Sequence, residues 1–245
     1  MEVGRIDLSH STSILSSYLQ TPRRGHLLEV LHVYAYVKKT ITLSLVLNPA
    51  DFAPIKAEKS YDQNDWTDFY PDAKENIPDD VPKPRGLSIK ITAFVDADHA
   101  SNLKNRRSHS GIIIFLQSAP VIWYSKAQKT VETSTHGSEL VATRIGIELV
   151  ESLRYKLRMF GVPLDEPATI YCDNMSVVHN AQRPDSVLKK KHNAISFHKI
   201  REAVAANIVT IYKIDSQLNV SDLLTKCLSG VKTEFHVRKL LFNEN

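Results

Sequence analysis

Residues 88–96 read SIKITAFVD, a stretch in which apolar and polar side chains alternate until the run stops at Asp96. Such alternation is typical of a β-strand with one face in a core. Two further apolar runs follow, at residues 111–116 and 121–125, with a turn at residues 117–120 between them. Three strands joined by short connections predict an antiparallel meander.

A long helix is predicted next, over about residues 138–160, because apolar residues recur at every fourth position. It ends at Gly161-Val162-Pro163, a glycine C-cap followed by a proline. The elements predicted after it are a strand at 169–172, a short helix from 174, a helix at 194–206, a strand at 208–214 and a last helix at 220–226. This order, β-β-β-α-β-α-β-α with two helices before the last strand, predicts an α/β fold with a five-stranded mixed sheet flanked by helices.

The segments on either side of this core differ from it. Helical spacing over residues 26–39 and alternation over residues 41–47 predict one helix and one strand, which cannot bury their own apolar faces and need a partner. Residues 49–88 hold six of the eleven prolines and predict a linker, anchored locally by aromatic residues such as Trp66. The chain therefore divides into an N-terminal block at 1–48, an acidic, proline-rich linker at 49–88, a core at 89–228 and a tail at 229–245.

Composition limits the class of protein. The 245 residues are 42% hydrophobic and 24% charged, which predicts a folded chain. A net charge of +4 permits nucleic-acid binding without requiring it. Two cysteines, Cys172 and Cys227, predict neither a disulfide framework nor a zinc site. There is no secretory signal and no apolar run near the ~20 residues that span a bilayer, so we expect a reduced, soluble, intracellular protein without a membrane partner.

Acidic residues stand at the ends of the predicted elements. Asp96 follows the first strand, and Asp173 follows the strand at 169–172. Glu139 lies in the first turn of the long helix, and Asp222 lies near the start of the last one. If the two strands are neighbours, these carboxylates can meet at one edge of the sheet, where they repel one another unless cations neutralise them. Two Mg²⁺ ions held by such a group can activate water and stabilise the leaving oxygen of a phosphodiester.

Each carboxylate also has a purely structural interpretation. Asp173 can form a turn with Asn174, Glu139 can interact with the helix dipole, and Asp222 can begin a helix. Phosphodiester chemistry is therefore predicted from the joint placement of the four residues and from none of them alone.

Motifs in the core resemble those of a known family. FVDAD at 94–98 and RRSHSG at 106–111 resemble its Y-V-D-A-D and R-R-S-T-S-G, and IYCDN at 170–174 resembles its strand end I-Y-C-D-N. Further matches are WYSKAQKTV at 123–131 to W-x-S-K-x-Q-x-T-V, STHGSE at 134–139 to S-S-T-E-A-E, residues 191–202 to K-H-I-D-I-R-Y-H-F-I-R-E, and SDLLTK at 221–226 to A-D-I-L-T-K. Over residues 91–228 the sequence resembles the ribonuclease H region of copia-type (Ty1/copia) retrotransposon polyproteins, and the N-terminal block is similar to the thumb-side end of the family's reverse transcriptase.

The resemblance implies a ribonuclease H fold and hydrolysis of the RNA strand of RNA–DNA hybrids during reverse transcription. It implies two Mg²⁺ ions, with Mn²⁺ as a possible substitute, and no small-molecule cofactor. The implied partners are the hybrid and the remainder of the reverse transcriptase polyprotein, in a cytoplasmic virus-like particle or in the nucleus. The residues implied as catalytic and metal-binding are Asp96, Glu139, Asp173 and Asp222.

Basic and polar residues near the predicted site are candidates for the hybrid backbone. Their structural alternative is a solvated charged face. Telling RNA from DNA requires contacts to the 2′-hydroxyl, for which groups in the 174–176 turn are possible donors. The candidate nucleic-acid residues are Arg106, Arg107, Asn174, Ser176, Lys189, Lys190, Lys191 and His192.

Departures from the family pattern leave two alternatives open. Gly137 replaces the first Glu of T-E-A-E, Cys227 replaces the proline of L-T-K-P, and residues 216–219 contain no histidine that could shuttle a proton. One alternative is a truncated, inactive relic that binds nucleic acid without cutting it. The other is an integrase-like strand transferase, which would prefer duplex DNA.

Overall fold

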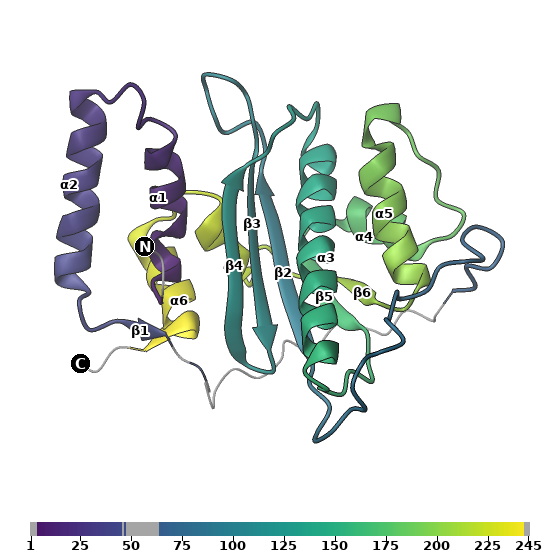
Figure 1. The fold of residues 1–245 in the computed structure, drawn as a ribbon. Coiled ribbons are helices and arrows are strands. Elements are labelled where there is room, and N and C mark those ends of the chain that lie inside the picture. The colour runs from purple at the N-terminus through teal and green to yellow at the C-terminus, as the bar shows by residue number, and fades with distance from the viewer. Residues whose placement is uncertain (1–3, 46, 48–63, 243–245) are drawn as a thin grey trace.

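The predicted mixed sheet is confirmed by the computed structural model, which describes residues 4–45, 47 and 64–242 (Figure 1). The five strands lie in the order β4-β3-β2-β5-β6. The first three form the antiparallel meander, and β5 and β6 continue the sheet parallel to β2. Their bounds are β2 Ile91–Asp98, β3 His109–Leu116, β4 Ala119–Ala127, β5 Ala168–Cys172 and β6 Val209–Lys213.

Helices cover one face of the sheet, as Figure 1 shows to the right of β2. They are α3 (Thr135–Met159), α4 (Met175–Gln182) and α5 (Ala194–Ala205). Successive strand residues point to opposite faces, so Val95 packs under these helices while Phe94 packs on the other side. Both are fully buried, and the sheet therefore needs a second covering layer.

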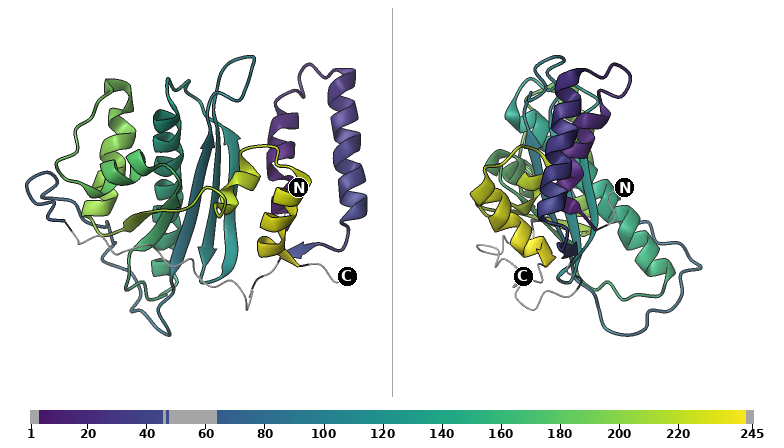
Figure 2. Two further views of the ribbon diagram at one scale, coloured as in Figure 1. Left: turned by 180° about the vertical axis from the view of Figure 1, so that it is seen from behind. Right: turned by 90° about the vertical axis from the view of Figure 1, so that its left-hand side faces the viewer.

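The two ends of the chain supply that second layer (Figure 2). The N-terminal end comprises the short 3-10 helix η1 (Ile6–Leu8), α1 (Ser9–Ser16), α2 (Arg24–Lys39) and β1 (Ser44–Leu45). The C-terminal end comprises α6 (Gly230–Leu240) and β7 (Leu241–Phe242), and β7 pairs antiparallel with β1. The tail of the same chain is thus the partner of β1, whereas α2 buries none of its residues and leaves Leu27, Leu31 and Tyr34 exposed. Among the described residues no helix is long and apolar enough to cross a bilayer.

The helix predicted at residues 220–226, the last of the core, is not observed as an α-helix. Residues 220–224 form a 3-10 turn, η3 (Val220–Leu224), which Asn219 caps by accepting a hydrogen bond from the Ser221 N–H. It stops because the hydroxyl of Thr225 bonds to Asp96 and its N–H bonds to the carbonyl of Asp222, three residues back. The regular helix of this region is α6, in the predicted tail. Of the strand predicted at 41–47 only β1 (Ser44–Leu45) is observed: residues 41–43 form a turn and an irregular position, residue 47 is a bend, and residue 46 lies outside the described residues.

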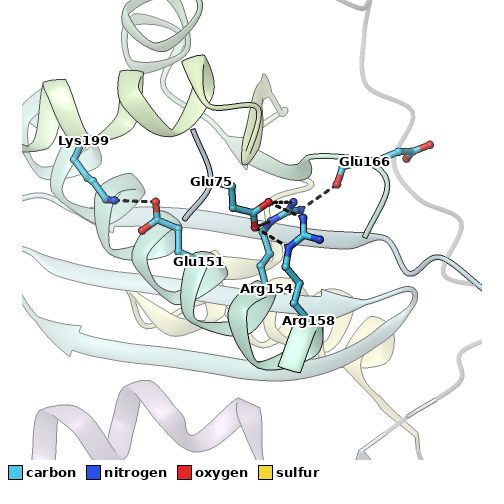
Figure 3. Close-up of polar contacts among 6 residues, drawn as sticks. All are labelled: Glu75, Glu151, Arg154, Arg158, Glu166 and Lys199. Carbon is cyan, nitrogen blue, oxygen red and sulfur yellow. Dashed lines mark hydrogen bonds and ion pairs between the residues drawn. The ribbon is translucent and has the colours of Figure 1, made fainter. Parts of the chain in front are cut away.

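Part of the predicted linker is bound to the core. Residues 49–63 lie outside the described residues, and residues 64–88 contain no helix or strand. Trp66 is buried, and the guanidinium of Arg201 on α5 lies 4.9 Å from its ring centroid. Glu75 bonds to Arg154 and Arg158 of α3, as Figure 3 shows. The predicted anchoring at Trp66 is confirmed.

Candidate metal and nucleic-acid site

Strand pairing places two of the predicted carboxylates at one edge of the sheet. β2 and β5 are parallel neighbours, with Val95 opposite Cys172. Asp96 and Asp173 are the next residues on each strand, so they follow at the same edge. Asp96 is 2% exposed, whereas Asp173 is partly exposed. The prediction that these two strands are neighbours is confirmed.

The first turns of α3 bring Glu139 to this edge. Ser134 caps the helix by accepting a hydrogen bond from the Gly137 N–H. Glu139 is buried, and its Oε1 accepts a hydrogen bond from the Ala97 N–H at 3.3 Å. Its Oε2 has no hydrogen-bond partner within residues 4–45, 47 and 64–242. One ligand atom each of Glu139, Asp173 and Cys172 lie within 4.8 Å of one another.

The η3 turn supplies the fourth carboxylate, Asp222, from the opposite side. This turn packs directly on β3, where a Cβ at Gly111 would lie 2.6 Å from Thr225 Cγ2. The Thr225 hydroxyl donates to Asp96 Oδ2. Lys226 Nζ lies 2.8 Å from Asp222 Oδ1 and 3.6 Å from Asp96 Oδ2. Asp96 connects the two parts of the cluster, since it interacts electrostatically with Asp222 and its charge also acts on Glu139 and Asp173. The group of ligand atoms within 4.8 Å of one another contains Glu139 and Asp173 but neither Asp96 nor Asp222.

Burial and mutual repulsion raise the pKa values of three of the acids, Asp96, Glu139 and Asp173. Burial raises the pKa of Asp96 to about 6, with the charge of Lys226 opposing and that of Asp222 adding to the shift. Burial, with the charges of Asp96 and Asp173, raises the pKa of Glu139 well above its usual value. Burial and the charge of Asp96 also raise the pKa of Asp173. These directions mark a site where negative charge is crowded and incompletely balanced.

Lys226 is the cation that the cluster already contains. Its own burial acts to lower its pKa, but the charges of Asp96 and Asp222 outweigh burial and raise the pKa to about 12. The charge of Lys213 also acts on Asp173, so two ammonium groups face four carboxylates and leave negative charge in excess. The buried, unpartnered Glu139 Oε2 and the all-oxygen set of acids fit hard divalent ions, which favour carboxylate ligands. The residues present therefore fit a metal site.

The predicted nucleic-acid residues divide into two groups. Lys190 Nζ donates to Thr133 Oγ1 at 3.0 Å and to Ser134 Oγ at 3.2 Å. His192 Nε2 lies 3.5 Å from Glu132 Oε2. Asn174 caps α4 by accepting from the N–H groups of Ser176 and Val177. The predicted residues whose side chains are exposed are Arg106, Arg107, Ser176, Lys189, Lys191 and also His192.

Three residues of this region were not singled out from the sequence. The spacing of Asp222 and Lys226, four residues apart, is a signal for an ion pair that could have identified the lysine. The Thr225 hydroxyl and Glu132 give no such signal, because their contacts to Asp96 and to residue 192 cross long stretches of sequence.

Known proteins resemble both the sequence and the fold. The chain is 29% identical over 156 residues to the retrovirus-related Pol polyprotein from transposon RE2 of Arabidopsis thaliana, which covers 64% of this chain and 11% of that protein. It is 26% identical over 235 residues to the Pol polyprotein from transposon TNT 1-94 of Nicotiana tabacum, covering 96% and 15%. This chain is similar to transposon Pol polyproteins. The resemblance seen in the core motifs is confirmed.

The chain spans only 11 to 15% of the length of these Pol relatives. No protein-family model matches it. Among solved structures, LC11-RNase H1 in complex with an RNA/DNA hybrid is similar, with 16% identity, a TM-score of 0.44, and coverage of 56% of this chain and 94% of that one.

Proposed function

We propose that this chain is the ribonuclease H part of a transposon Pol polyprotein and that it hydrolyses the RNA strand of RNA–DNA hybrids with divalent metal ions. One observation carries the proposal. Asp96, Glu139, Asp173 and Asp222, which are up to 126 positions apart, converge at one edge of the sheet. The similarity to Pol polyproteins supports a substrate formed in reverse transcription, and the remainder of the polyprotein is the expected partner.

The four carboxylates would hold two Mg²⁺ ions, for which Mn²⁺ can substitute. Bound ions of this kind polarise an attacking water and neutralise charge on phosphodiester oxygens. The chain itself contributes the fixed carboxylate array, in which Ala97 N–H orients Glu139 and Thr225 orients Asp96. These hydrogen bonds hold the acids in place before substrate arrives, which lowers the cost of organising the site.

The exposed cations would bind the hybrid backbone. Arg106 and Arg107 lie in the loop that follows β2, at the edge where Asp96 and Asp98 end that strand. Lys189 and Lys191 are exposed in the loop before α5. Because cations displace counterions from the nucleic acid, affinity should fall as salt increases.

The proposal is tested by incubating the chain with a hybrid labelled on its RNA strand, with Mg²⁺ and with a chelator. We expect RNA fragments only with the metal, and a loss of at least about 100-fold in rate for Asp173→Asn, because preorganised electrostatic groups contribute rate factors of this order. Glu148→Gln, an exposed change on the same helix as Glu139, is the matched control. Equal cleavage by Asp173→Asn and wild type would refute the assignment.

A second candidate function follows from Lys226. Its ammonium lies between Asp96 and Asp222 and partly balances the cluster without any metal. This favours a domain that binds hybrids without cutting them. In that case the chain would bind a hybrid in a salt-dependent manner and release no RNA fragments at any Mg²⁺ or Mn²⁺ concentration.

A further inference from the structure

A buried carboxylate outside the four-acid cluster lies just before α3. Glu132 is 7% exposed, and its Oε1 accepts a hydrogen bond from the Thr130 hydroxyl at 2.9 Å. Its Oε2 has no hydrogen-bond partner in the part of the chain that the structure describes. Burying a carboxylate with an unsatisfied oxygen costs free energy, so packing alone does not account for Glu132.

A side chain of the basic loop, residues 189–192, approaches this oxygen. His192 Nε2 lies 3.5 Å from Glu132 Oε2. Two positions earlier in the loop, Lys190 donates to the hydroxyls of Thr133 and Ser134. The basic loop therefore meets the segment 132–134 at two separate points, which we call the loop junction.

Gly137 makes room for the loop junction. A Cβ at this position would lie 2.8 Å from Glu132 Oε2 and 3.4 Å from Asn193 Nδ2. A side chain at residue 137 would therefore displace the Glu132 carboxylate from its observed position, and glycine lets it stay there. The resembling motif T-E-A-E carries a glutamate at position 137, whereas here the carboxylate beside Gly137 comes from position 132.

We propose that Glu132 is a positioning residue that docks the basic loop on the beginning of α3, replacing from position 132 the carboxylate that the motif carries at position 137. As far as it concerns the hybrid, this inference rests on the proposed function. Glu132 acts through His192 and touches neither substrate nor metal. It leaves Lys189 and Lys191 exposed for the hybrid while the loop backbone is held.

The test compares wild type with Glu132→Ala, Gly137→Glu and the double variant. Glu132→Gln is the conservative variant that keeps the side-chain volume, and Glu148→Ala is the matched control. Hydrogen exchange of residues 186–193 reports the docking of the loop without any substrate. Affinity for a hybrid, and KM and kcat with Mg²⁺, report its consequence.

We expect Glu132→Ala to speed exchange of the loop and to raise KM by about tenfold, equivalent to about 1.4 kcal/mol, while kcat changes less than about twofold. Gly137→Glu alone should also loosen the loop because its side chain meets Glu132. The double variant should recover most of the exchange protection and of the affinity. Thermal unfolding of each variant shows that the domain is folded.

Two results would overturn the proposal. The first is a folded Glu132→Ala or Glu132→Gln protein whose loop exchange and KM equal those of wild type. The second is a double variant whose loop protection and affinity for the hybrid do not exceed those of Glu132→Ala. This would refute the claim that a carboxylate at position 132 replaces one at position 137. If wild type neither binds nor cuts hybrids, the proposed function fails, and loop exchange in the same variants still decides whether Glu132 docks the loop.

Discussion

Asp96 interacts electrostatically with each of the other three acids of the candidate site. It is buried at the end of β2, and three other carboxylates and one ammonium surround it. The sequence predicted the carboxylates from their positions after strands and at helix starts. The spacing of Asp222 and Lys226 indicates an ion pair between these two residues, but the approach of Lys226 to Asp96 could not be predicted, because it depends on the contact between Thr225 and Asp96 that crosses a long stretch of sequence.

The raised pKa of Asp96 predicts how stability depends on pH in the absence of metal. Folding raises this pKa from 3.8 to about 6, so the folded state binds the proton more tightly than the unfolded state. The stabilisation is complete below about pH 4 and is lost as pH rises through about 6. Asp96→Asn removes the charge and should stabilise the metal-free protein at pH 7 by roughly 1–3 kcal/mol.

Denaturant unfolding at pH 4 and pH 7, with a chelator present, measures this effect. The free energy of unfolding of Asp96→Asn should exceed that of wild type at pH 7 and differ little from it at pH 4. Asp165→Asn, an exposed aspartate elsewhere, serves as control. A loss of stability at pH 7 in Asp96→Asn would show that the carboxylate is stabilised by its ion pair with Lys226 more than it is penalised by burial.

Removing the ammonium of Lys226 gives a second prediction. Lys226→Met should destabilise the metal-free protein, by roughly 1–3 kcal/mol, because it leaves Asp96 and Asp222 without their cation. Added Mg²⁺ should then raise the unfolding temperature of the variant more than that of wild type. Differential scanning fluorimetry across a Mg²⁺ series decides this, and an equal metal response in both proteins would contradict it.

Among the elements, the strands and the long helix were predictable because their apolar periodicity extends over many residues. The predicted strand that ends at Asp96 is observed as β2, and the predicted helix at 138–160 is observed as α3, three residues longer at its start. The error at residues 220–226 arose because the segment that became η3 has only five residues, and so short a sequence does not distinguish a 3-10 helix from an α-helix. The helix in the tail was not predicted, although it completes the second core cluster.

The contribution of α6 to that cluster can be measured. Leu240 is fully buried among residues from both ends of the chain. Leu240→Ala should cost about 2–5 kcal/mol, the usual range for such a cavity in a core. Leu228→Ala, at a half-buried position in the same region, should cost less. Chemical denaturation gives both values, and a negligible effect of Leu240→Ala would show that α6 is not part of the folded core.

The ion cluster between the linker and α3 predicts acid sensitivity (Figure 3). Burial opposes ionisation of Glu75, but hydrogen bonds from Arg154 and Arg158 outweigh it and lower the pKa from 4.5 to about 2. The stabilisation is therefore present above about pH 4.5 and is lost as pH falls toward 2. Glu75→Gln should destabilise the protein by about 1–3 kcal/mol at pH 7 and should flatten the acid limb of its stability profile.

Unfolding followed between pH 7 and pH 2 checks this prediction. Glu148→Gln, which breaks an exposed pair with Arg144, should change stability by less than about 0.5 kcal/mol. If the two variants behave alike, the linker does not hold α3 in the way that the hydrogen bonds indicate.

The molecule as a whole is a sheet enclosed by two layers that have different origins. The α3–α5 layer belongs to the core that the sequence predicted, whereas the N-terminal block and the tail form the second layer together through β1 and β7. The division into 1–48, 49–88, 89–228 and 229–245 stays a prediction. The four acids lie where the sheet, α3 and η3 meet, so their convergence depends on the complete fold.

Binding of Mn²⁺ to the full chain, followed by titration calorimetry at low salt, tests most directly whether the four acids form a divalent-ion site. We predict saturable binding in wild type, displaced by Mg²⁺ and lost or strongly weakened in both Glu139→Gln and Asp96→Asn. Binding that is undiminished in these two folded variants would contradict the account.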